Sequence, residues 1–174
     1  MASRSMALDF GLDKCPGRRM KFRWLLTIED VCGTTSKGVS TLPPIKSARP
    51  SYSFREAEAR HLVETIYYPT KIDTKPLQVT LYDTSNGKHP IMEWLKKLYD
   101  PKEATWKFPA VESYCKTASL ILLDGCGKTI ETWTYEDVWP LSADFTDLDM
   151  GSSEVVTCDL TLRYSRAYLV ESGS

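Results

Sequence analysis

Three groups of residues carry side chains whose types and spacing suggest chemistry, and the first is Gly127-Lys128-Thr129. These residues match the end of a phosphate-binding loop, in which backbone N–H groups and a lysine surround phosphate oxygens. The full motif needs a glycine where Leu122 stands, and it needs a helix to follow. The next residues, "TIETWTYE", alternate in the manner of a strand. The sequence therefore predicts a β-hairpin, with "ASLILL" paired to "TIETWTY", and no nucleotide site.

The second group is the cysteines and histidines. The chain has five cysteines and two histidines, at Cys15, Cys32, Cys115, Cys126, Cys158, His61 and His89. No two cysteines have the close spacing of zinc ligands, and no local sequence indicates a Cys–His catalytic pair. Cys158 lies on the apolar face of a strand pattern, as a small core residue would. The pattern predicts neither a metal centre nor a nucleophile.

The third group is acidic. Asp144, Asp147 and Asp149 resemble a loose cation loop, but the remaining ligand spacing of a calcium site is missing. They belong to a longer stretch between Lys128 and Arg163 that contains no basic residue. Its acids are Glu131, Glu136, Asp137, Asp144, Asp147, Asp149, Glu154 and Asp159. The first 23 residues are basic in excess, so the two stretches are either solvated faces or unlike surfaces that associate head to tail.

Composition limits the class of protein. The chain has 174 residues, a net charge of −1, 42% hydrophobic and 26% charged residues, which is ordinary for one globular domain. No apolar run is long enough to cross a bilayer, and the N-terminus lacks the apolar core of a signal peptide. We therefore expect a protein made in a cytoplasm. Acids surround Trp133, Tyr135 and Trp139, which disfavours binding of nucleic acid by a basic patch.

Strand patterns dominate the chain. Alternating apolar residues predict strands near residues 22–28, 61–68, 77–83 and 154–164, with a turn-rich bend around Pro69 and Pro76. A short strand is expected in "SYSF", and one helix in "HPIMEWLKKLYDP", which has a proline at its start and its stop. The segment 33–50 is rich in Gly, Ser, Thr and Pro and reads as a long loop.

These elements predict a mainly β protein: an antiparallel β-sandwich or barrel with one flanking α-helix and long loops. We expect a single domain over residues 1–174, with an N-terminal arm at 1–19 and a long loop or arm at 33–50.

The order of elements and two stretches of sequence resemble a known family. The stretches are "YYPTKIDTKPLQVTLYDT" at 67–84 and "LDMGSSEVVTCDLTLRY" at 148–164. Together with the aromatic first strand, the Trp-bearing helix and the apolar hairpin, they resemble the tail tube proteins of contractile-tailed bacteriophages. The similarity runs from about residue 20 onward. The N-terminal segment and the five cysteines have no counterpart in that pattern.

The resemblance implies a structural virion protein and not an enzyme, with no cofactor. Such subunits form hexameric rings whose strands join one barrel, and the rings stack into a tube inside a contractile sheath. The implied partners are further copies of the chain, the tail sheath protein, the baseplate and tail terminator proteins, the tape measure protein, and then DNA during ejection into the host. The implied location is the virion tail, assembled in the host cytoplasm.

Other functions stay open on sequence grounds. One alternative within the same structural class is a secretion-system or pyocin-type tube protein or a baseplate tube initiator. From a different class, it is a small β-barrel that binds a ligand or a Cys–His enzyme.

The resemblance also gives the candidate residues a place. We expect the eight acids named above to line the lumen or to meet the basic N-terminal region of the next ring. We expect a loop between rings at Gly33, Lys37, Pro43, Pro44, Lys46 and Arg49. Cys15, Cys32 and Cys126 lie in loop-like sequence and are candidates for disulfides between subunits once a particle meets an oxidising environment.

Overall fold

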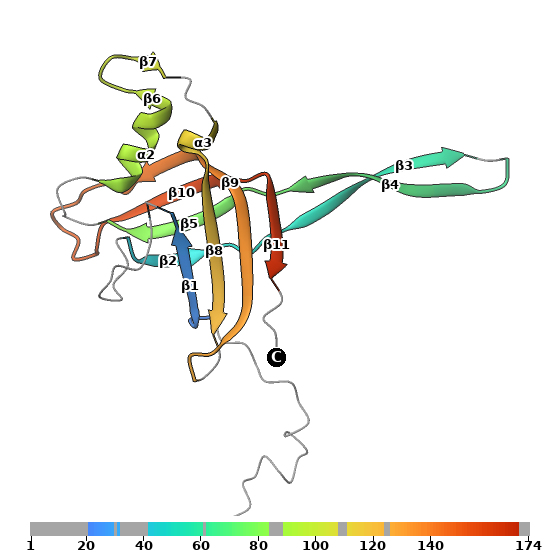
Figure 1. Cartoon of the computed structure of the whole chain (residues 1–174), viewed down its shortest axis with the longest axis horizontal. Coiled ribbons are helices and arrows are strands. Elements are labelled where there is room, and N and C mark those ends of the chain that lie inside the picture. Colours follow the sequence, from blue (N-terminus) through green and yellow to red (C-terminus); the bar gives the residue numbers. More distant parts are fainter. Residues whose placement is uncertain are drawn as a thin grey trace, which may run out of the picture.

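The computed structural model describes residues 21–29, 31, 42–60, 62–83, 89–107, 111–123 and 126–170. Figure 1 shows a body of curved β-sheet, a helix packed at one side and a long hairpin that projects from the body. The expected arm at 1–19 lies outside the described residues, as does the first part of the segment 33–50.

One seven-stranded antiparallel sheet forms the body. Its order is β1-β8-β9-β10-β5-β2, with β11 also paired to β9. The strands are β1 (Trp24–Ile28), β2 (Pro44–Ser47), β5 (Leu77–Tyr82), β8 (Lys116–Leu123), β9 (Thr129–Phe145), β10 (Thr157–Arg163) and β11 (Arg166–Val170). The predicted β8–β9 hairpin is confirmed. The outermost strands of this path, β1 and β2, are not paired with each other, so the described sheet is open and not a closed barrel.

The 17-residue strand β9 belongs to both halves of this sheet. Its first part pairs with β8 and β11, and its last part pairs with β10. Between them Asp137 has a φ of 53°, in the left-handed region that Asp tolerates better than most residues. Register shifts lie on both neighbouring strands, at Lys116/Ala118 and at Thr161/Leu162. The bend turns the second half of the sheet over the first.

The core fills the concave side of the bent sheet. Along β5 and β10 the inward positions are aliphatic or cysteine and fully buried, while polar residues such as Gln78 and Asp159 point outward. The predicted inward face of residues 154–164 is confirmed at Cys158, Leu160, Leu162 and Tyr164. Tyr135 and Val138 of β9 complete the core at the bend.

The predicted helix is confirmed as α2 (Pro90–Leu98), which begins at its proline. It buries Ile91 and Trp94, and the Trp94 Nε1–H donates to the Tyr114 carbonyl at 2.6 Å. A small hairpin of β6 (Tyr99–Asp100) and β7 (Thr105–Trp106) follows, then the one-turn helix α3 (Val111–Tyr114). These elements cover one end of the sheet (Figure 1).

The projecting hairpin differs from the sequence prediction. It consists of β3 (Tyr52–Arg60) and β4 (Thr65–Thr74), paired only with each other. The sequence predicted a bend around Pro69, but Pro69 lies within β4, opposite Glu56 and just after a register shift. An isolated two-stranded ribbon has free edges, where the missing N–H of a proline costs no ladder hydrogen bond.

The segment 33–50 is not a loop throughout. Pro44–Ser47 forms β2 and pairs with β5, and the preceding Leu42 is fully buried. The prediction of a loop was therefore wrong for these residues. Two adjacent prolines and the lack of alternation conceal a strand at a sheet edge, where proline is tolerated.

No helix among the described residues is long and apolar enough to cross a membrane.

Candidate assembly surfaces

The β3–β4 hairpin exposes apolar side chains along its whole length. Leu62 and Val63 at its end have relative exposures of 106% and 93%. Phe54, Ile66, Tyr67, Tyr68 and Ile72 are also exposed. A two-stranded ribbon cannot bury such side chains by itself. An exposed apolar surface of this extent marks an interaction site.

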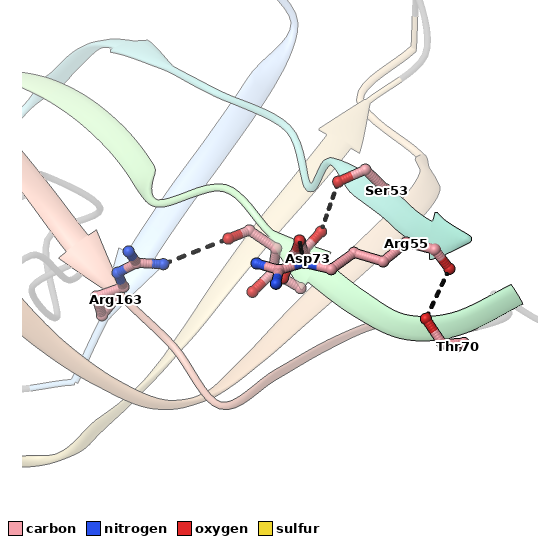
Figure 2. A network of polar contacts seen from close by, with 6 residues as sticks. Ser53, Arg55, Thr70, Asp73 and Arg163 are labelled. Atoms are coloured by element: carbon pink, nitrogen blue, oxygen red, sulfur yellow. Dashed lines mark hydrogen bonds and ion pairs between the residues drawn. The ribbon is translucent and has the colours of Figure 1, made fainter. Parts of the chain in front are cut away.

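Polar contacts stiffen the hairpin near its root, as Figure 2 shows. The Arg55 Nε–H donates to the Asp73 carboxylate at 2.5 Å, and the Ser53 hydroxyl donates to the Asp73 carbonyl at 3.2 Å. The Thr70 hydroxyl donates to the Arg55 carbonyl at 3.0 Å. The hydrogen bond to Asp73 also raises the pKa of the Arg55 guanidinium. These contacts join the two strands across the register shift beside Phe54.

Two further hydrogen bonds tie the root to the body. Arg163 of β10 donates to the Thr74 carbonyl at 3.3 Å, which is also visible in Figure 2. The Tyr52 hydroxyl donates to the Ala167 carbonyl of β11 at 2.5 Å, and burial raises the pKa of this phenol. The hairpin therefore leaves the body in a direction fixed from both sides.

Glu131 is not at the surface. Its side chain is only 6% exposed and accepts hydrogen bonds from the Arg49 guanidinium and the Trp133 indole N–H. The expectation that Glu131 lines a lumen or meets a neighbouring ring is wrong, because its charge is buried and paired within the chain. Arg49, expected in a contact between rings, is the partner of this buried acid.

The other acids fall into three places. Glu136 accepts a hydrogen bond from the Tyr168 hydroxyl at 3.0 Å, which raises the pKa of Tyr168, and Asp137 forms the bend of β9. Asp144 and Asp159 lie directly opposite each other on the outward face of β9 and β10. Asp147, Asp149 and Glu154 are exposed between β9 and β10.

The outward face of β5, β9 and β10 is polar. The Thr80 hydroxyl donates to the Asp159 carboxylate at 2.5 Å, and Gln78, Ser142 and Thr161 continue this face. Like charges directly opposite each other, as at Asp144 and Asp159, destabilise a sheet. The Thr80 hydrogen bond offsets part of that cost.

The loop between β9 and β10 combines acids with apolar residues. Leu148, Met150 and Val155 are exposed beside its acids. The Gly151 N–H donates to the Asp149 carboxylate at 2.8 Å, and the Thr146 hydroxyl donates to the Thr157 carbonyl at 2.7 Å. We call residues 146–156 the acidic loop.

A groove between β1, β2 and β8 was not foreseen from the sequence. It has a volume of about 480 Å³ and is lined by Lys21, Trp24, Ile45, Lys46, Ser47, Arg49, Leu120 and Leu122. We call it the basic groove. The excess of basic residues near the N-terminus was a partial signal, but the contribution of β2 was hidden by the loop prediction.

The remaining candidate residues are only partly described. Gly33, Lys37, Cys15 and Cys32 lie outside the described residues, while Pro43, Pro44 and Lys46 lie in or beside β2. Cys126 is exposed in the β8–β9 turn, and Cys115, Cys126 and Cys158 form no disulfide. Burial raises the pKa of Cys158 to about 11. The described residues contain no group of His, Cys, Asp and Glu able to hold a metal ion.

Solved structures with a similar fold come from contractile injection systems. A chain of the anti-feeding prophage baseplate is similar with a TM-score of 0.66 and 16% identity, covering 89% of this chain and 97% of that one. A chain of the sheath-tube complex of the extracellular contractile injection system PVC has a TM-score of 0.63 and 16% identity, covering 97% and 99%. No curated protein matches the sequence. The fold, together with a match to a family of tail tube proteins, defines the class of protein: a tube subunit of a contractile injection system.

The particular family is given by the sequence itself. The family described as T4-like virus tail tube protein gp19 matches residues 21–167. The chain belongs to this tail tube family, and the resemblance seen in the sequence is confirmed.

Proposed function

We propose that the protein forms hexameric rings that stack into the tube of a phage tail, inside a contractile sheath, and that this tube conducts DNA into the host. The protein is a structural component of the particle and not an enzyme. Further copies of the chain, the sheath, the baseplate, the tail terminator and the tape measure protein are its partners. Assembly takes place in the host cytoplasm.

The projecting hairpin is the observation that carries self-assembly. Its apolar residues, with Leu62 and Val63 almost fully exposed, have no cover in the described part of the chain. Because Tyr52 and Arg163 tie its root to the body, the hairpin is presented outward as an arm. A neighbouring copy that covers this arm also removes free strand edges that would otherwise aggregate.

The polar sheet face supports DNA as the cargo. Asp144 and Asp159 oppose each other there at a cost in stability, which is consistent with a surface kept acidic for its function. An acidic lumen repels phosphates over a Debye length of about 8 Å at physiological salt, so DNA slides without binding. We therefore place the outward face of β5, β9 and β10 in the lumen.

A second candidate is the tube of an extracellular injection system. It is favoured by the similar folds of the anti-feeding prophage and PVC chains, although identities of 16% support the fold alone. DNA that is protected from nuclease inside native particles supports the phage tube. Particles free of nucleic acid would favour the second candidate.

Negative-stain electron microscopy of the purified protein tests self-assembly. We expect rings or hollow tubes, and we expect Leu62→Asp with Val63→Asp to abolish them while leaving the monomer folded. A matched control is Lys102→Asp with Glu103→Lys, which changes two exposed residues away from the hairpin. A wild-type protein that stays monomeric at all concentrations would contradict the proposal.

A further inference from the structure

We propose that the acidic loop of one copy docks into the basic groove of a second copy. This contact rests on the proposed self-assembly and specifies one surface pair through which it occurs. The two surfaces share no residue, so the contact is of the head-to-tail kind, which repeats to form rings or stacks.

The groove has an apolar floor and a basic rim. Trp24, Leu120 and Leu122 lie within it. Lys21 and Lys46 are exposed at its edge. Arg49 is already paired with the buried Glu131, so Lys21 and Lys46 are the two lining residues that offer positive charge to an incoming segment, although Lys46 also borders a neighbouring pocket that contains Asp144 and Asp159. This combination fits a segment that carries both apolar side chains and acids.

The acidic loop has that composition. Leu148 and Met150 have relative exposures of 83% and 108%, beside the acids Asp147, Asp149 and Glu154. Its turn is held in place, because the Asp149 carboxylate accepts from the Gly151 N–H at 2.8 Å and its carbonyl accepts from the Ser152 N–H at 3.2 Å. A preformed turn loses less conformational freedom on binding.

Charge favours this occupant over two others. Residues 1–20 of the chain contain more basic than acidic residues and would be repelled by the lysines of the groove. The hairpin end is less acidic than the loop, since Arg60 is paired with Glu58 at 2.6 Å. The acidic loop contains three acids and no base. Charge complementarity of this kind also sets which partner is accepted.

A charge swap tests the contact. The groove variant is Lys21→Glu with Lys46→Glu, the loop variant is Asp147→Lys with Glu154→Lys, and the swap variant contains all of these changes. Lys96→Glu with Lys102→Glu is the matched control, because both lysines are exposed and lie outside the groove. Assembled protein is measured by sedimentation and electron microscopy, and the fold of each monomer by circular dichroism.

We expect the groove and loop variants each to raise the protein concentration needed for assembly about tenfold, which corresponds to about 1.4 kcal/mol. The swap variant should assemble within about twofold of wild type. Mixed with wild type, it should form separate particles, because each mixed contact brings like charges together. The control should assemble like wild type.

Three results would overturn the contact. The first is normal assembly of both one-sided variants, and the second is failure of the swap to restore assembly. The third is restored assembly of the groove variant when Glu64→Lys is added, which would show that the hairpin end, and not the acidic loop, binds in the groove. Each of these is observed with a wild-type protein that assembles, whereas a wild type that forms no particle contradicts the proposed function itself.

Discussion

The carboxylate of Glu131 is buried on a strand whose other acids are exposed or half-buried. The alternation along β9 indicated that Glu131 is buried, because Glu131 lies on the same face of the strand as the fully buried Tyr135. Sequence reasoning grouped it instead with the other acids of its stretch, and the partner that makes burial possible, Arg49, is 82 positions away. A pairing over that distance follows from the path of β2, which was not predicted.

Removing Arg49 should destabilise the protein. Arg49→Ala leaves Glu131 buried without its counter-charge, and because the arginine is about half exposed we expect a loss of about 1–2 kcal/mol in the free energy of unfolding. Urea unfolding measures this loss. Adding Glu131→Gln should recover part of it, since the neutral amide still accepts from Trp133. No change on Arg49→Ala would show that the pair contributes nothing to the fold.

Ionisation of the Cys158 thiol should lower the free energy of unfolding at alkaline pH. Folding raises the pKa of the thiol from 9.0 to about 11, mainly because burial disfavours the thiolate. Between pH 9 and 11 the unfolded chain therefore loses this proton before the native chain does, and the free energy of unfolding falls by about 2–3 kcal/mol. Cys158→Ala should lack this component. Parallel unfolding curves of the two proteins across that range would contradict it.

At the scale of elements, the bend of β9 depends on one backbone conformation. Asp137 has a φ of 53°, which costs a β-branched residue about 1–2 kcal/mol. We expect Asp137→Val to lower the unfolding free energy by that amount and Asp137→Gly to be nearly neutral. Thermal unfolding of both variants checks this. Equal destabilisation by both would show that the Asp side chain, and not the backbone, matters at this position.

The hairpin gives a second test at this scale. Trypsin should cut the free monomer after Arg60, because among the described strands β3 pairs only with β4. Burial by a neighbouring copy should protect this bond in assembled protein. Arg163, the last residue of the central strand β10 and opposite Trp139 of β9, is the internal control and should stay uncut in both forms. Equal cleavage of Arg60 before and after assembly would place the hairpin outside the interface.

Elements whose apolar residues follow a strand or helix pattern could be predicted from the sequence. Elements that depend on pairing with distant parts of the chain or with another copy could not. The alternation in β5, β10 and the first part of β9, the apolar run of β8 and the proline at the start of α2 predicted these elements, whereas the continuation of β9 through Pro140 to Phe145 was not predicted. The hairpin has no buried face within the described part of the chain, so its side chains give no inside–outside alternation: the bend predicted at Pro69 falls within β4, and the hairpin turn lies between Arg60 and Thr65. The strand β2 is short and bordered by prolines, and its pairing with β5 is a tertiary effect.

For the whole molecule, thermal stability should rise with protein concentration. Copies that cover each other's apolar hairpins stabilise the native state by mass action. Each tenfold increase in protein concentration should stabilise the assembled native state by about 1.4 kcal/mol per contact. The melting temperature should therefore rise by about one to a few degrees. The Leu62→Asp, Val63→Asp variant should melt at a temperature independent of concentration. A wild-type melting temperature that does not change would argue against assembly through this surface.

The continuous path of β9 has a mechanical consequence. Because one 17-residue strand belongs to both halves of the sheet, a force applied to the half that contains β11 crosses the bend along the covalent backbone of β9 and then reaches β10 and β5 through their ladder hydrogen bonds. On both sides of the bend the antiparallel ladders run along this strand, so tension on it loads many hydrogen bonds in shear at once and does not open them one by one. Tension along β9 would therefore be resisted by both halves of the sheet together.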